Sequence, residues 1–235
     1  MSKQTQLDQK NSIANRSKAG KRPEVKARLM DVAEALFADH SFHSVSVRDI
    51  TQAAGTRLAD INELFGSKDI LFREVIIRRA SLINEDRLLL LSSVVISDNK
   101  EIDLYSIVQA FGDPFLKRSA ESEGWRNYLR LLSQLVNTKS VVLLLIADYF
   151  NSIAEAFIKR ISETLPHLNE RQLLNTYQFM LSTMLSVFSE NHSIDVLSQD
   201  RLHSSDFDEH YEDVKDFIVG GMLKMGGYTQ TTKLR

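Results

Sequence analysis

The stretch 46–71, SVRDITQAAGTRLADINELFGSKDIL, constrains the fold more than any other part of the chain. Ser46 is a residue type that caps helix starts, and Asp49 stands three positions on, where a capping box has its acidic partner. Gly55 follows this short predicted helix at a point where a sharp turn needs a residue that tolerates positive φ. A second apolar pattern at helical spacing covers 58–65, and a new helix starts just beyond it. Helix, tight turn and short helix together predict a helix-turn-helix.

A helical hairpin of this kind more often serves packing than DNA binding, but the wider sequence shifts the balance. Residues 26–71 resemble the DNA-binding domain of TetR-family transcriptional regulators. The match comprises an amphipathic first helix, the turn glycine and a closing F-x-S-K-D-x-L pattern, all in one register. The matching positions are Ala33, Leu36, Phe37, Phe42, Val47, Asp49, Ile50, Ala54, Gly55, Ile61, Phe65, Ser67, Lys68, Asp69 and Leu71.

The resemblance implies an all-α fold, with an N-terminal three-helix helix-turn-helix domain followed by a larger helical domain for ligand binding and dimerisation. It also implies double-stranded DNA with a near-palindromic operator as a partner, and a homodimer as the working form. Among the matched positions and their neighbours, the side chains expected to face the major groove are Arg48, Thr56, Arg57, Asp60 and Asn62, while Ser46 and Lys68 are expected to hold phosphates.

The chain departs from the family pattern at several of these positions. The family usually has glycine where Ser41 stands, Val-Ser where Thr56 and Arg57 stand, and an aromatic residue where Asn62 stands. Because an arginine side chain cannot accept hydrogen bonds from helix amides, we expect Thr56 or water to cap the helix that starts at Leu58.

Two carboxylates, Asp60 and Glu63, lie on the helix that is expected to face phosphates, where they lower DNA affinity. A carboxylate can accept a hydrogen bond from cytosine N4 and so read sequence. Solvent-facing or salt-bridged charge is the more frequent role of such residues, and both alternatives stay open.

Charge and composition divide the chain into segments. Up to Arg79 there are 14 Lys and Arg against 10 Asp and Glu, whereas the rest of the chain has 15 against 21. Residues 1–22 are polar and basic, so we expect a disordered arm that is either solvated or follows the DNA phosphates. The expected segments are this arm, a helix-turn-helix domain over 23–71 whose helix from Lys68 connects to the next part, a ligand-binding and dimerisation domain over 72–227, and a tail over 228–235.

The larger domain is predicted to consist of helices throughout. We expect helices over about 101–117, 124–136, 139–165, 169–189 and 211–225. The first should break or kink near Gly112, Asp113 and Pro114. The helix from Lys139 should be buried, because the run 141–146 is apolar on all sides. The polar stretch 192–208 is predicted to be a loop.

Aromatic and methionine residues on several of these helices form either plain core or an adaptable apolar pocket. The resemblance favours the pocket, because TetR-like chains bind an inducer in this domain. Its candidate ligand-binding residues are Trp125, Tyr128, Tyr149, Phe150, Tyr177, Met180 and Met184, with Asn127 as a further polar contact.

Other functions find little support in the sequence. The chain has no cysteine, and its histidines lack metal-site spacing, so we expect no catalytic residues, no metal and no cofactor. No signal peptide or long apolar stretch is present, and we expect a cytoplasmic protein that is not an enzyme. The sequence thus indicates a ligand-responsive transcriptional repressor, released from its operator by a mainly apolar small molecule. The alternative is a helical binding or structural protein whose helix-turn-helix has lost specific operator recognition.

Overall fold

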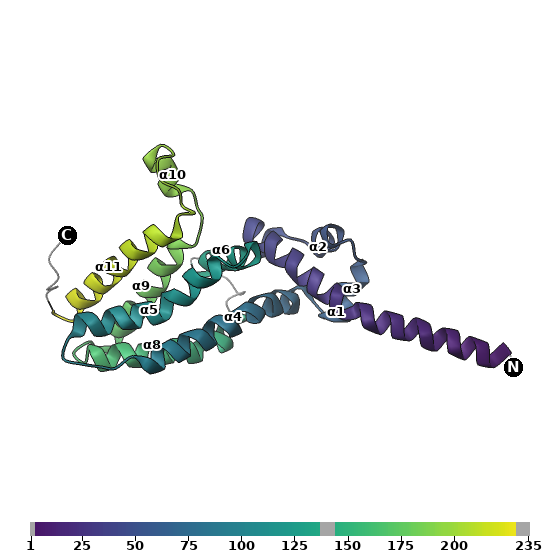
Figure 1. Ribbon diagram of the computed structural model, residues 1–235, viewed down its shortest axis with the longest axis horizontal. Helices are drawn as coiled ribbons and strands as arrows, with labels where there is room; N and C mark the ends of the chain where they lie inside the picture. Colours follow the sequence, from purple (N-terminus) through teal and green to yellow (C-terminus); the bar gives the residue numbers. More distant parts are fainter. Residues whose placement is uncertain (1–2, 137–143, 229–235) are drawn as a thin grey trace. The chain divides into compact units, whose positions relative to one another are not determined.

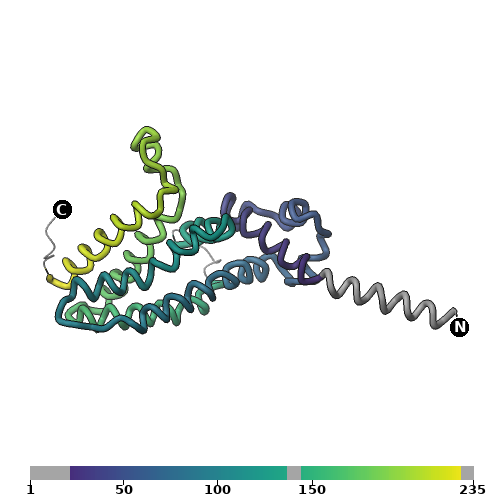
Figure 2. The backbone as a smooth tube through the Cα atoms, viewed as in Figure 1, coloured from purple at the N-terminus to yellow at the C-terminus, as the bar shows by residue number. Residues whose placement is uncertain are grey.

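The computed structural model describes residues 3–136 and 144–228, with side chains from residue 22 onward. All regular structure in these ranges is α-helical, as predicted, and no described residue lies in a strand (Figure 1). The chain divides into two compact units, Met1–Val75 and Ile76–Arg235. The division falls within α4 (Lys68–Ser93), which Figure 2 traces as one uninterrupted helix. The predicted boundary after residue 71 lies in the same helix.

The first unit contains α1 (Lys3–Ser44), α2 (Val47–Ala54), α3 (Leu58–Leu64) and the first turns of α4. Apolar positions at helical spacing on these helices meet in one small core. The side chains of Phe37, Phe42 and Phe72 make tilted and edge-to-face contacts, with ring centroids 4.9 to 5.7 Å apart. Fully buried around them are Leu29, Ala33, Ile50, Ile61, Leu71 and Val75.

The predicted local signals of the helix-turn-helix are confirmed. Ser46 Oγ accepts a hydrogen bond from the Asp49 amide at 3.2 Å, and the Asp49 carboxylate accepts one from the Ser46 amide at 2.8 Å. Gly55 adopts the left-handed conformation, with φ 60° and ψ 42°, and so ends α2. The turn into α3 therefore follows from residues within a few positions of it.

Two features of α1 concern the predicted arm and the position of Ser41. Its bounds take in most of the segment 1–22, but side chains are described only from residue 22, so the disordered arm stays a prediction. Near its other end, Ser41 leaves helical geometry with φ 64° and ψ 158°. This region of backbone space is populated almost only by glycine. The TetR-like pattern usually has glycine at this position. Because serine carries a Cβ, the backbone of Ser41 is strained in this conformation.

The second unit holds the rest of α4 together with α5 (Lys100–Ser119), α6 (Glu123–Val136), α8 (Ala147–Thr164), α9 (Glu170–Val187), α10 (Ser193–Ser198) and α11 (Phe207–Met225). Helices α5 and α9 both pack along α11 (Figure 1). Helix α9 starts at a capping box, in which the side chains of Asn169 and Gln172 each accept a hydrogen bond from the other residue's amide. None of the described helices is long and apolar enough to cross a membrane.

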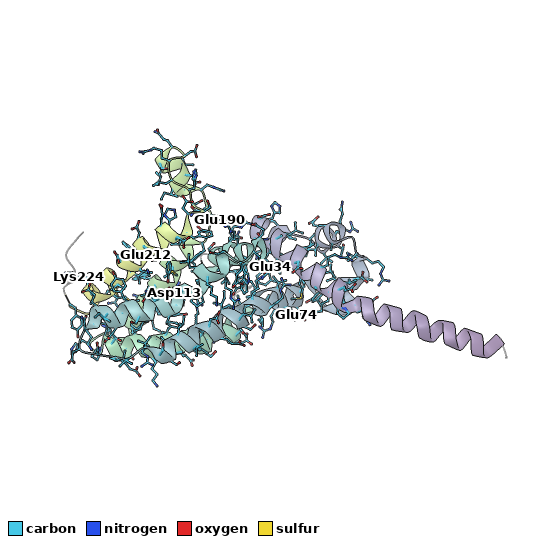
Figure 3. The ribbon with its side chains drawn as sticks, viewed as in Figure 1. Glu34, Glu74, Asp113, Glu190, Glu212 and Lys224 are labelled. Carbon is cyan, nitrogen blue, oxygen red and sulfur yellow. The ribbon has the colours of Figure 1, made fainter. Side chains whose placement is uncertain are left out.

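Of the predicted break or kink in α5, the break does not occur, because α5 runs as one helix through Gly112, Asp113 and Pro114. Gly112 instead allows a close approach. A Cβ there would lie 2.6 Å from the Tyr211 ring and 2.7 Å from the Met184 side chain. The Tyr211 hydroxyl donates a hydrogen bond to the carboxylate of Asp113, which is labelled in Figure 3. Glycine at this position lets α11 pack closely against α5.

Two further boundaries differ from the sequence prediction. The predicted start of a helix at Lys139 lies outside the described residues, and a turn at 145–146 precedes α8. The described end of the apolar run is only partly buried, since Ile146 is 3% exposed and Leu144 is 75% exposed. Within the predicted loop 192–208, residues 193–198 form α10. The carboxylate of Asp195 in this helix accepts a hydrogen bond from the Ser204 amide.

Candidate DNA-binding and ligand-binding sites

The start of α3 is arranged differently from the expected cap. Asp60 accepts a hydrogen bond from the backbone amide of Arg57 at 2.9 Å, and its other carboxylate oxygen pairs with the Arg57 guanidinium. The Arg57 hydrogen bond is the main cause that lowers the pKa of Asp60. Thr56 is not the cap, since its Oγ1 is buried and finds no hydrogen-bond partner in the described part of the chain. The acidic side chain of Asp60 therefore satisfies the Arg57 amide, as the acidic partner of a capping box does, while the Arg57 side chain makes no cap hydrogen bond to the helix.

This pair continues into a short chain of charges. Glu63 lies 3.7 Å from the guanidinium of Arg57 and 3.7 Å from that of Arg22 on α1. The Arg57 side chain is 72% exposed, whereas that of Asp60 is 13% exposed. The carboxylates of α3 thus lie in ion pairs, which supports the salt-bridged alternative over base reading. They also reduce the positive charge that Arg57 presents to a phosphate.

The other predicted DNA-contacting residues fall into two groups. Arg48 and Asn62 are exposed, and in the described part of the chain neither side chain takes part in a hydrogen bond or ion pair, so both are free to meet a ligand. Ser46 is occupied as the cap of α2. Leu58, predicted to be on the apolar side of α3, is 50% exposed and adds an apolar group of the kind that contacts thymine methyls.

Lys68 has a structural role that the sequence did not reveal. Its Nζ donates hydrogen bonds to the carbonyl oxygens of Phe42 and Val45, each at 2.9 Å, and lies 4.1 Å from the centre of the Phe42 ring. The ammonium therefore connects the start of α4 to the last turn of α1 and to the link between α1 and α2. Its assignment to a DNA phosphate stays untested, and two of its three donors are already used.

The second unit contains an apolar cavity of about 300 Å³, lined by residues of α4, α5, α6, α8 and α9. That volume is at the lower end of the range for small-molecule sites. Apolar side chains make up most of its wall, among them Phe115, Leu132, Phe150, Ile153, Leu181 and Leu185. The polar groups in the wall come from Arg87, Asn151 and Tyr177.

Arg87 is the charged residue of this cavity. The residue is 3% exposed, and its Nε donates to the carbonyl oxygen of Phe111 at 2.8 Å. Its Nη2 is buried and has no hydrogen-bond partner among the residues that the structure describes. The guanidinium carbon lies 3.8 Å and 3.9 Å from the centres of the Phe111 and Phe115 rings. Burial lowers the pKa of Arg87 to about 10, which still leaves it protonated at neutral pH.

Of the predicted ligand-binding residues, only Phe150 and Tyr177 line this cavity. Trp125 is buried, with the guanidinium carbons of Arg79 and Arg118 at 4.7 and 5.1 Å from its ring centre. The remaining four lie elsewhere: Tyr128 and Met184 are in the core, Tyr149 is half-buried, and Met180 lines a different groove.

The sequence contained a signal for Arg87 that pattern reading passed over. Arg87 falls in the same helical register as Ala80, Ile83 and Leu91, all of which are buried. A charged residue in the apolar stripe of a helix is a candidate for a buried functional group. The connecting role expected for α4 gave no indication that Arg87 lines a cavity.

A second hollow lies between α9 and α11, with a volume of about 390 Å³. Phe179 and Phe217 line it and are 58% and 73% exposed. Gly221 also lines it, and a Cβ there would meet no atom within 4 Å. The two helices thus share an uncovered apolar face in the single chain.

Family models match both units of the chain. The model described as bacterial regulatory proteins, tetR family, matches residues 29–75, and the one described as tetracyclin repressor-like, C-terminal domain, matches residues 109–221. Together they span about two thirds of the chain. No curated protein sequence matches it.

Solved structures share the fold at low sequence identity. A bacterial regulatory protein of the tetR family from Rhodococcus RHA1 is 16% identical with a TM-score of 0.57, over 88% of this chain and 98% of that one. AibR in complex with isovaleryl coenzyme A and operator DNA is 13% identical, with a TM-score of 0.57 over 84% and 97% of the two chains. FadR from Bacillus subtilis in complex with stearoyl-CoA is 13% identical, with a TM-score of 0.54 over 83% and 98%.

Proposed function

Because the chain belongs to the TetR family of bacterial regulatory proteins, we propose that it is a ligand-responsive repressor that a mainly apolar small molecule releases from its operator. The observation that carries this proposal is the apolar cavity of the second unit, with Arg87 in its wall. Arg87 and Lys68 lie on one continuous helix, and Lys68 is bonded to the helix-turn-helix. Ligand binding in the cavity can therefore bias the geometry of the DNA-binding unit, by as much as the ligand's affinities for the two states differ.

The structural relatives support a DNA-binding first unit and a ligand-binding second unit. AibR was solved with both an acyl-coenzyme A and operator DNA, and FadR with an acyl-coenzyme A. In this chain we assign DNA contact to Arg48, Asn62 and the exposed face of α3, with Arg57 as a phosphate contact that Asp60 and Glu63 weaken. The operator should be near-palindromic, because two copies of α3 would meet two half-sites.

We assign homodimer formation to α9 and α11. Phe179 and Phe217 are large apolar side chains on the surface of the single chain, at the groove between these helices. Gly221 lies inside α11, four residues before its end, and glycine within a helix is destabilising by about 0.5 to 1 kcal/mol relative to alanine. No contact with another described residue requires this glycine. A second copy of α11 crossing closely at this point would give it a role.

The competing function is that of a helical binding protein without operator specificity. The ion pairs of Arg57 with Asp60 and Glu63 favour it, because they reduce the charge offered to DNA. The two functions differ in their response to duplex DNA, since phosphate contacts give a steep dependence of affinity on salt concentration.

Selection of bound DNA from a random pool with the purified protein tests the proposal. A repressor should enrich a near-palindromic sequence, and its affinity for that sequence should exceed random-sequence affinity by about a thousandfold or more. Recovery of no consensus, together with a flat salt dependence, would establish the competing function. Arg48→Ala should relax one position of the consensus, and an unchanged consensus would remove Arg48 from the base-reading set.

A further inference from the structure

We propose that the cavity of the second unit binds an amphipathic monocarboxylate and that Arg87 receives its carboxylate. The inference rests on the proposed ligand response and deepens it, because it replaces a generally apolar effector with a defined head group. The tail of the ligand would occupy the apolar part of the cavity, against Phe150, Leu181 and Leu185.

The first argument is that the buried guanidinium of Arg87 has no anionic partner among the described residues. A buried cation is normally paired with a carboxylate or fully hydrogen-bonded, since removal from water is otherwise very unfavourable. Arg87 is 3% exposed, and no described carboxylate lies within ion-pair distance of it. Among the groups that act on it electrostatically are the phenols of Tyr177 and Tyr211, whose pKa values burial raises above the usual value, so they carry no charge at pH 7. An anion supplied from outside would complete this site.

The second argument is preorganisation. The hydrogen bond from Nε to the Phe111 carbonyl and the contacts with the Phe111 and Phe115 rings fix the guanidinium in one plane. Nη2 is left with its donors unpaired within the described ranges 3–136 and 144–228. A planar fork that is held in place loses little entropy when it receives a carboxylate, and charge-assisted hydrogen bonds of this kind are among the stronger ones in proteins.

The size and lining of the cavity restrict the rest of the ligand. About 300 Å³ suits a medium-length acyl chain or a substituted aromatic ring, and not an enclosed nucleotide carrier. The other polar wall residues, Asn151 and Tyr177, carry no formal charge at neutral pH. A second charge on the ligand would therefore be buried unpaired, and a cation would be repelled by Arg87. One negative charge on an otherwise apolar body fits these constraints.

Ligand pairs that differ only in the head group test the inference with the full-length protein and without DNA. Decanoate is compared with decanol, and 4-pentylbenzoate with 4-pentylbenzyl alcohol, by calorimetric titration and thermal shift. At least one carboxylate should bind about tenfold or more tightly than its alcohol, as expected for a buried charge-assisted hydrogen bond. Decanoyl-coenzyme A and decyltrimethylammonium complete the panel, and both should bind more weakly than decanoate.

Variants then assign the preference to the guanidinium. Arg87→Met keeps an apolar side chain of similar length and should abolish the carboxylate preference while alcohol binding persists. Arg160→Met removes an arginine of α8 that pairs with Glu163 outside the cavity, and should leave the preference unchanged. Equal binding of acid and alcohol to the wild-type protein would overturn the inference even if Arg87→Met failed to fold. Binding of neither class, or tighter binding of the coenzyme A thioester, would overturn it as well.

DNA release is measured separately, so that the two proposals fail in different ways. If decanoate binds with the predicted Arg87 dependence but leaves operator affinity unchanged, the carboxylate site stands and the release mechanism fails. If an uncharged compound binds in the cavity and releases DNA, the release mechanism stands and the carboxylate site fails.

Discussion

The carboxylate of Asp60 accepts hydrogen bonds from both the backbone amide and the guanidinium of Arg57, across the first turn of the expected recognition helix. One side chain therefore satisfies the amide at the start of the helix and partly neutralises the cation beside it. A serine cap, as the family usually has, would leave the charge balance of this turn unchanged. The two roles of Asp60 make stability and DNA affinity oppose each other at this position.

Asp60→Asn should strengthen binding to random duplex DNA and make its salt dependence steeper, because Arg57 becomes available to one phosphate. The slope of log affinity against log salt should change by about 1. Fluorescence anisotropy over a salt series measures it. Asp69→Asn makes the same charge change in the first turn of α4, and an equal effect there would mean that net charge alone is responsible.

Ser41→Gly should stabilise the first unit. Ser41 has φ 64° and ψ 158°, and a residue held in such a region costs about 1 to 3 kcal/mol, of which glycine relieves most. Denaturant unfolding should therefore show a higher free energy of unfolding. His40→Gly, one residue earlier in helical geometry, should have the opposite sign, by about 0.5 to 1 kcal/mol. Destabilisation by both changes would contradict the strain at Ser41.

Lys68→Met should lower the stability of the first unit, because the carbonyl oxygens of Phe42 and Val45 lose their donor. A loss of about 1 to 3 kcal/mol is expected from two hydrogen bonds to a charged group. Thermal unfolding followed by circular dichroism measures it. Arg48→Ala, also in the first unit, should leave the melting temperature nearly unchanged. An unchanged melting temperature for Lys68→Met, with weaker binding to all DNA, would restore the phosphate assignment.

Phe217→Glu should convert a dimer into a monomer, since it buries a charge in the face shared by α9 and α11. Sedimentation at micromolar concentration should give a mass near twice 26.8 kDa for the wild type and near 26.8 kDa for the variant. Val95→Glu places the same charge at a residue that is 81% exposed and lies outside these helices, and should stay dimeric. A monomeric wild-type protein would rule out this assembly.

Local signals account for what the sequence predicted well. The capping box at Ser46 and the left-handed Gly55 involve residues within three or four positions of one another. Their geometry is set before the chain packs. The pairing of Arg57 with Asp60 is equally local, and its spacing could have identified the cap.

Contacts between distant parts of the chain account for most of what the sequence did not predict. Lys68 bonds to carbonyls 26 and 23 residues earlier, and no short-range pattern specifies such a partner. The aromatic residues of the second unit were all plausible pocket residues, but only packing decides that Phe150 lines the cavity while Trp125 does not. Arg87 lies between these cases. Its position in the apolar stripe of α4 follows from helical spacing in the sequence, whereas the lack of a described hydrogen-bond partner for its Nη2 depends on tertiary packing.

The contact of Tyr211 with Gly112 also limits how this chain can change over evolutionary time. Any side chain at position 112 would overlap the Tyr211 ring, and a smaller residue at position 211 would leave a void and an unpaired Asp113. Either substitution alone is unfavourable, whereas the two together preserve the fit of α5 with α11. Related sequences that keep this crossing should therefore change positions 112 and 211 jointly, with glycine facing an aromatic residue or a larger residue facing a small one.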